Sequence, residues 1–177
     1  MTVEDFDIIR GCKKNVRSSQ QELLEKYSGY LMAVIRRYCK DNVVAQDIIQ
    51  ETWIQIFKNI KSYEEKGLLR AWMAKIAISK CYKQFRKSTR IDDLDQLPDA
   101  VDNTPNVIDH LQYEDLMKIV NTIGKPRRDV FVMKIIDGLS HKEISSILEI
   151  KESTSRAHLS NARKELRILL ATPTMVL

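Results

Sequence analysis

The most distinctive chemical pattern of this chain lies in its last third, in a basic segment that follows a turn signal. Small, hydrogen-bonding and basic side chains recur there at helical spacing, opposite an apolar stripe: Ser153, Arg156, Ala157, Ser160, Asn161 and Lys164. Such side chains suit the major groove of DNA, where base edges present donors and acceptors. Arg163 lies nearer the apolar stripe, and we expect it to contact phosphate. The alternative interpretation is an ordinary helical hairpin with a solvated, charged face.

A second pattern consists of acidic and amide side chains. Asp47, Gln50 and Glu51 are three and four residues apart, which places them on one face of a helix. They could be ordinary surface residues, or two of them could hold Mg²⁺ in a nucleic-acid enzyme. No Gly-rich phosphate loop, nucleophile elbow or metal-binding motif accompanies them. The sequence therefore predicts neither a catalytic site nor a cofactor.

A third pattern interleaves basic residues with aromatic rings. The basic residues are Lys80, Lys83, Arg86 and Lys87, and the rings are those of Tyr82 and Phe85. Cations follow phosphates and rings stack on unpaired bases, so this mixture suits single-stranded or melted nucleic acid. Alternatively, the two rings belong to the hydrophobic core and the helix is merely solvated on its other side.

A helix-turn-helix is expected to position the basic segment of the last third. Gly138 can adopt the left-handed conformation that ends a helix, and Ser140 and Glu143 have the spacing of a capping box. The helix before this turn has a stripe at helical period: Val130, Phe131, Lys134 and Ile135. The helix after it is expected to bury Leu159, Ala162, Leu166 and either Leu169 or Leu170.

Apolar residues recur at spacings of three and four along the whole chain, which predicts an all-α fold. A long amphipathic helix is expected around Leu23 to Tyr38, and Asp41 can cap the next one. A polar loop from Lys61 to Gly67 leads to a third core helix, which begins near Leu69 and continues into the basic and aromatic stretch.

The chain is expected to form two small helical domains. The first covers residues 1–87 and the second, which contains the helix-turn-helix, covers residues 111–177. Between them, residues 88–110 are rich in Asp, contain Pro98 and Pro105 and have no sustained periodicity. This composition predicts an acidic, flexible linker.

Charge is distributed in blocks. From Lys58 to Arg90 there are ten basic residues and two acidic ones, whereas from Ile91 to Asp115 there are eight acidic residues and no Lys or Arg. Such a change along the chain indicates segments with different partners.

Composition also excludes several classes of protein. The three cysteines are widely spaced and contain no CxxC pair, so neither a disulfide framework nor a zinc site is expected. The three histidines lie far from one another in sequence, and no metal site is expected of them. No apolar run approaches membrane-spanning length, so we expect a soluble, cytoplasmic chain without membrane insertion.

Taken together, these motifs resemble those of a bacterial RNA polymerase sigma factor of the small, two-domain, extracytoplasmic-function type. The resemblance rests on Asp47-Ile48-Ile49-Gln50-Glu51, on Leu69 to Ala77 with its Trp72, Ile76 and Ala77, and on Val130 to Ile144. It covers the chain from about Gln20 to Leu170, in the same order and spacing.

The resemblance implies a set of roles. Asp47, Gln50 and Glu51 would bind the clamp of core RNA polymerase. The loop from Lys61 to Leu69, with Lys61 and Tyr63, and the helix from Trp72 to Lys87 would meet the −10 element of promoter DNA as it opens. The helix from Glu152 onward would read the −35 element. A membrane-bound anti-sigma factor is expected as a further partner, and the chain itself would not be an enzyme.

The chain departs from the family pattern at several positions. Glu149 stands where the family often has Gly at the turn, so it must adopt a less comfortable backbone. Lys151 replaces a capping Ser, and Ser155 replaces an inward aliphatic residue. In the first domain, Ser79 stands where many members have Asn and Lys83 where they have Asp. The alternative function is that of a stand-alone helix-turn-helix regulator, which would bind duplex DNA without polymerase.

Overall fold

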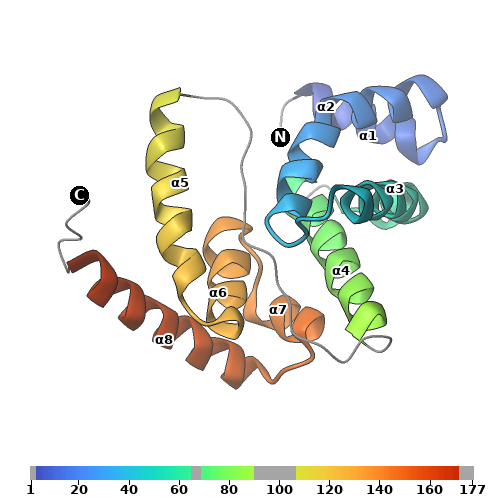
Figure 1. Ribbon diagram of the computed structural model, residues 1–177. Coiled ribbons are helices and arrows are strands. Elements are labelled where there is room, and N and C mark those ends of the chain that lie inside the picture. Colours follow the sequence, from blue (N-terminus) through green and yellow to red (C-terminus); the bar gives the residue numbers. More distant parts are fainter. Residues whose placement is uncertain (1–2, 65–68, 90–106, 172–177) are drawn as a thin grey trace. The chain divides into compact units, whose positions relative to one another are not determined.

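The computed structural model describes residues 3–64, 69–89 and 107–171, with side chains from 5–64, 69–86 and 115–171 (Figure 1). The described residues form helices and contain no strand, as the apolar periodicity predicts. The chain divides into two compact units, Met1–Asp102 and Asn103–Leu177. None of the described helices is long and apolar enough to cross a membrane.

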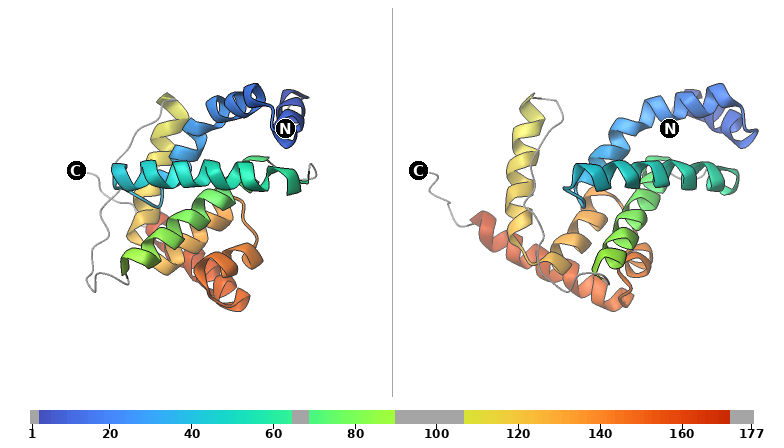
Figure 2. Two further views of the ribbon diagram at one scale, coloured as in Figure 1. Left: turned by 90° about the vertical axis from the view of Figure 1, so that its right-hand side faces the viewer. Right: turned by 45° about the vertical axis from the view of Figure 1, so that its right-hand side comes forward.

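The described residues of the first unit form a bundle of four helices and one short 3₁₀ turn. Its elements are α1 (Val3–Lys13), α2 (Arg17–Arg36), α3 (Asn42–Asn59), η1 (Ile60–Ser62) and α4 (Leu69–Thr89). The helix α2 packs against α1, α3 and α4, and α4 also packs along α3, as Figure 2 shows. The core is aliphatic, with Leu23, Leu31, Ile35, Ile56, Met73 and Ile78 fully buried. The cysteines Cys12, Cys39 and Cys81 are free thiols buried in this unit.

Asp41 is the N-cap of α3, as the sequence predicts. The side chain of Asp41 accepts hydrogen bonds from the backbone N–H groups of Val43 and Val44, at 2.8 and 3.1 Å. These bonds satisfy donors that the first turn of a helix leaves without partners. The predicted N-cap is therefore confirmed, and it sets the phase of the helix that carries the acidic motif.

The helix α1 was not among the predicted elements. It packs on α2 through a buried face that includes Ile8 and Ile9. Asp5, buried in the same contact, accepts a hydrogen bond from the Tyr27 hydroxyl at 2.7 Å and lies 3.1 Å from Lys26 Nζ. At Gly11 an added Cβ atom would lie 2.0 Å from the Oγ of Ser19, so the two helices approach as closely as a glycine permits.

The second unit is built around the long helix α8. Its elements are α5 (Val107–Thr122), α6 (Lys125–Phe131), η2 (Val132–Ile136), α7 (His141–Leu148) and α8 (Glu152–Ala171). The helices α5, α6 and α7 all contact α8, which lies along the bottom of the view in Figure 1. The helix α5 begins at Val107, four residues before the predicted start of the second domain at 111. Residues 90–106 of the predicted linker lie outside the described residues, and the domain boundaries remain predictions.

The helix-turn-helix signals are confirmed in detail. Gly138 has a φ angle of +74°, in the left-handed region. Ser140 caps α7 by accepting from the Glu143 N–H, while the Glu143 carboxylate accepts from the Ser140 N–H at 2.8 Å. Glu149 ends α7 with φ 58° and ψ 41°, the left-handed conformation expected where the family often has Gly.

Two predicted stripes need correction. Val132 and Met133 are fully buried, whereas Ile135 is 46% exposed, so the predicted stripe through Ile135 is not the buried face. The reason is that Val132–Ile136 forms a π-helix, whose wider turn shifts the phase of the apolar positions away from the α-helical period. On α8 the stripe of Leu159, Ala162 and Leu166 is confirmed, but Leu169 and Leu170 are 38% and 59% exposed. Burial along α8 therefore ends at Leu166.

Candidate partner and nucleic-acid interfaces

The acidic motif lies on the outer surface of α3. Asp47, Gln50 and Glu51 are all exposed, on the side of α3 away from its buried residues Ala45, Ile48 and Trp53. Glu51 Oε2 also forms an ion pair with Lys80 Nζ of α4, at 3.1 Å, so Glu51 reaches the neighbouring helix. The structure thus brings the three predicted residues onto one face, which we call the α3 carboxylate face.

Two exposed aliphatic side chains border this face, and sequence reasoning did not identify them. Val43 is 73% exposed and Ile54 is 56% exposed. They stand four residues before Asp47 and four after Gln50, a spacing that brings them to the same side of α3. The signal was available, since both residues fall outside the buried periodicity of the helix. Apolar side chains flanked by carboxylates are typical of a protein-binding surface.

The basic stretch of α4 is only partly available to a ligand. Lys83 and Arg86 are exposed, whereas the side chain of Lys80 is only 19% exposed and is held by Glu51. Lys80 therefore links α3 to α4, and its predicted role as a phosphate contact requires that this ion pair open. The side chain of Lys87 lies outside the described residues.

The aromatic rings of α4 pack mainly against the protein. Tyr82 makes edge contacts with Tyr38 and Phe85, with ring centroids 5.9 and 6.3 Å apart, and all three rings are half-buried or buried. Their packing supports the core interpretation more than a stacking platform of fully exposed rings. The part of this surface that is open to a ligand is cationic.

The two predicted DNA-binding residues that precede α4 differ in their exposure. Lys61, in η1, is exposed. Tyr63 is only 5% exposed and packs on Trp72, with ring centroids 4.9 Å apart. The predicted base contact by the ring of Tyr63 therefore requires that this packing on Trp72 open.

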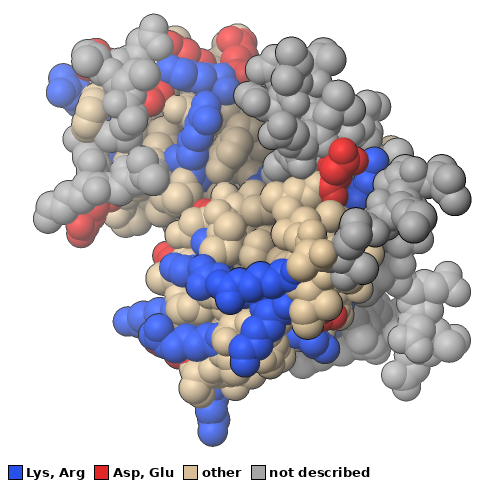
Figure 3. Space-filling model, turned by 90° about the vertical axis from the view of Figure 1, so that its left-hand side faces the viewer, with Lys and Arg blue, Asp and Glu red and all other residues tan. Residues whose placement is uncertain are grey.

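The predicted reading face of α8 is open to solvent along its length. All of its members are exposed: Ser153, Arg156, Ala157, Ser160, Asn161, Arg163 and Lys164. The guanidinium of Arg156 forms an ion pair with Glu152, which stands four residues earlier on the same helix, at 3.2 Å. Lys and Arg side chains gather in the lower part of the view in Figure 3. Basic and hydrogen-bonding side chains on one exposed helix face are of the type that contacts DNA in the major groove.

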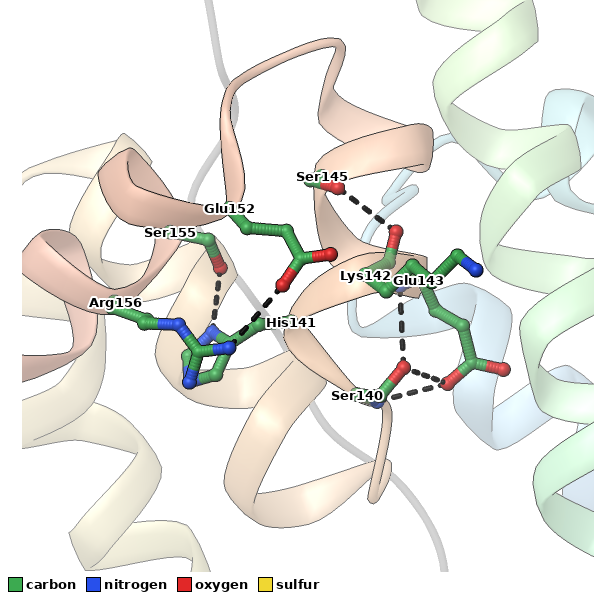
Figure 4. Close-up of polar contacts among 8 residues, drawn as sticks. All are labelled: Ser140, His141, Lys142, Glu143, Ser145, Glu152, Ser155 and Arg156. Atoms are coloured by element: carbon green, nitrogen blue, oxygen red, sulfur yellow. Dashed lines mark hydrogen bonds and ion pairs between the residues drawn. The ribbon is translucent and has the colours of Figure 1, made fainter.

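Two polar contacts fix α8 against the rest of its unit. Arg127 of α6 donates to Glu165 at 2.6 Å. Near the other end of α8, the buried Ser155 lies 2.9 Å from Nδ1 of His141, the first residue of α7, as Figure 4 shows. Because both contacts join separate elements, they set the angle at which the reading face is presented.

Among the described residues, no three His, Cys, Asp or Glu side chains converge as a metal-binding group. The described residues instead form helices with two candidate interfaces: the α3 carboxylate face beside the cationic surface of α4 in one unit, and a helix-turn-helix in the other.

Comparison with known families names this class. Residues 23–91 match the family model described as sigma-70 region 2, and residues 113–166 match the model described as sigma-70, region 4. The chain belongs to the RNA polymerase sigma factors, in the extracytoplasmic-function group. Sigma factors of this family are the initiation factors that direct transcription from promoters.

Individual relatives agree with this assignment. The chain is 28% identical to the extracytoplasmic-function sigma factor SigE of Mycolicibacterium smegmatis over 161 residues, which is 86% of this chain and 62% of that protein. It is 26% identical to SigW of Bacillus subtilis over 90% of this chain and 92% of that protein. The sigma factor RpoE of Bartonella quintana, solved with the anti-sigma factor NepR, has a similar fold, with a TM-score of 0.61, 23% identity and coverage of 86% and 97% of the two chains.

Proposed function

We propose that this chain docks on core RNA polymerase through the α3 carboxylate face and brings the polymerase to promoter DNA. The observation that carries the proposal is the exposure of Asp47, Gln50 and Glu51 on one helix face, with Val43 and Ile54 at its borders. The aliphatic residues supply apolar area, and the carboxylates select a basic partner surface.

The α4 surface is proposed to bind the −10 region as it opens. Lys83 and Arg86, with Lys61 of η1, offer cations to the phosphates of a separated strand. Lys80 and Tyr63 support this surface through the ion pair to Glu51 and the packing on Trp72. The link between Lys80 and Glu51 also ties the strand-binding helix to the polymerase-docking helix.

The second unit is proposed to read the −35 element with the outer face of α8. Arg156, Ser160 and Asn161 are placed for base edges, and Arg163 and Lys164 for phosphates. Each unit alone would bind weakly. Joined in one chain and held on one polymerase, the two units gain effective concentration for each other.

The remaining roles follow from this proposal. Such a factor works in the cytoplasm, where polymerase and promoters are found, and it is not an enzyme, because the polymerase performs the chemistry. The RpoE relative is solved with an anti-sigma factor. We propose that this chain is also held by an anti-sigma factor, which would compete for the faces named above.

Run-off transcription with core polymerase tests the docking role. The parent chain should support transcripts from a promoter library, and Ile54→Ala with Val43→Ala should weaken binding to core polymerase by about thirtyfold, since two interface anchors at ~1 kcal/mol each sum to ~2 kcal/mol. Asp47→Lys should weaken it further by placing like charge against a basic surface. A matched control is Lys58→Glu, an exposed charge at the end of α3. Docking through this face would be wrong if the α3 variants bound polymerase as tightly as the parent.

A further inference from the structure

A part-buried polar pair joins the two helices of the helix-turn-helix. His141 is the first residue of α7, and its Nδ1 lies 2.9 Å from the Oγ of Ser155, which is fully buried on the inner side of α8 (Figure 4). Ser155 stands where the family pattern has an aliphatic residue. An aliphatic side chain at this position would hold α8 by packing alone. A buried hydroxyl, in contrast, needs a hydrogen-bond partner, and a hydrogen bond depends on direction. The angle of α8 therefore depends on His141.

Charged residues from two other elements face the imidazole. Arg156, Arg163 and Glu152 approach it from α8, and Lys134 approaches it from η2. Burial, followed by the three cations, holds the pKa of His141 below its ordinary value of 6.5, while Glu152 acts in the opposite direction. In the free chain His141 is consequently neutral near pH 7.

The hydroxyl of Ser155 can serve both protonation states of this histidine. With neutral His141 it donates to Nδ1, and with the imidazolium it accepts from the Nδ1 proton. The hydrogen bond between His141 and Ser155 can therefore persist when the ring gains a proton. An aliphatic residue in place of Ser155 could form no hydrogen bond with either state of the ring. Protonation would change the charge of the reading surface without releasing α8.

We propose that His141 is a positioning residue for α8 and that DNA binding by the second unit takes up a proton at His141. The proposal rests on the DNA-binding role of α8 proposed above. DNA phosphates that contact Arg156, Arg163 or Lys134 would neutralise the cations that disfavour the imidazolium. The same phosphates would add a negative potential that favours it. By linkage, the duplex must then bind more tightly as the pH falls.

The first test measures the histidine itself. The three histidines of the full chain, His110, His141 and His158, are assigned by NMR and titrated with pH, with and without a short mixed-sequence duplex at low salt. The pKa of His141 should rise on addition of the duplex. A duplex that binds while the pKa of His141 stays unchanged would overturn the proposal.

The second test separates positioning from proton uptake. Duplex affinity of the parent should increase as the pH falls from about 8 to about 6, by up to tenfold per pH unit for one proton. His141→Phe should remove this dependence and weaken the preference for a selected −35 sequence. His141→Asn offers Ser155 an amide that does not titrate, so it should recover the sequence preference and leave the affinity independent of pH.

A matched control uses the other histidine of the unit whose side chain is described. His158→Gln, on α8, should retain the pH dependence of the parent. A dependence that disappears with His158 and survives in His141→Phe would refute the assignment to His141. Absence of duplex binding at every pH would refute the proposed DNA-binding role of α8. Binding that is specific but independent of pH in the parent would refute only the proton uptake.

Discussion

At the scale of single residues, buried polar groups form bridges between helices. Asp5 and Tyr27, each 4% exposed, join α1 to α2 through a hydrogen bond of 2.7 Å. Burial, followed by the interactions with Asp5, raises the pKa of Tyr27 to about 12. The folded chain therefore favours the neutral phenol of Tyr27, whose hydroxyl donates a hydrogen bond to Asp5.

Tyr27→Phe should lower the free energy of unfolding by ~1–3 kcal/mol, because the buried Asp5 carboxylate loses a donor. The stabilisation from Tyr27 is fully present below its ordinary pKa of 10.0 and is lost as the pH rises from 10.0 towards about 12. Urea unfolding at neutral and alkaline pH measures both effects. The control is Tyr30→Phe, whose hydroxyl lies 3.4 Å from the Arg70 carbonyl oxygen. Equal losses in the two variants would contradict the role of Asp5.

Some features of single residues were predictable from the sequence, and others were not. Asp41, Ser140 and Gly138 were predictable because caps and left-handed turns depend on neighbours close in sequence. The burial of Tyr63 and the ion pair of Lys80 depend on Trp72 and Glu51, which come from other segments of the chain. Composition and spacing give no signal of that kind, so the sequence could not predict that these two predicted DNA contacts also pack within the fold.

At the scale of elements, α3, α4, α7 and α8 followed from apolar periodicity, while α1 and the π-helical run did not. The helix α1 is short, and its buried face combines apolar residues with a carboxylate, Asp5, which weakens the periodic signal. Its packing on α2 includes a close approach at Gly11, besides the contact of Asp5 with Tyr27.

A pair of glycine substitutions tests this approach. Gly11→Ala should destabilise the first unit by ~1–3 kcal/mol, because its Cβ would lie 2.0 Å from Ser19 Oγ and the helices must separate. Gly29→Ala, in α2, has no atom within 4 Å of the new Cβ and should stabilise the chain by ~0.5–1 kcal/mol through helix propensity. Chemical denaturation of both variants decides the matter. Should Gly11→Ala prove as stable as Gly29→Ala, α1 does not pack on α2 as described.

At the scale of the whole molecule, we propose that the two units divide duplex reading from strand opening. The first unit carries the proposed docking face and the cationic part of α4, and the second carries α8. This division predicts that damage to α4 affects a later step than damage to α3 does. It is testable because a premelted template removes the work of opening.

Lys83→Ala with Arg86→Ala should leave assembly with core polymerase intact and reduce open-complex formation several-fold, since two phosphate contacts to the opened strand are lost. A promoter with a premelted −10 region should recover part of this loss. Permanganate reactivity of thymines measures opening directly. Normal reactivity in the double variant on a fully paired promoter would exclude this surface. Lys80 is left intact, because its loss would also disturb Glu51 on the docking face.

The π-helical run Val132–Ile136 has a consequence for how this chain is compared with its relatives. Its hydrogen bonds, such as that from the Asp137 N–H to the Val132 carbonyl at 3.0 Å, span one residue more than those of an α-helix. One residue of an α-helix corresponds to a rotation of about 100°. A relative with an uninterrupted α-helix here would therefore need a single-residue gap in the alignment. Without that gap, every apolar position between Val132 and Gly138 would be matched to the wrong neighbour.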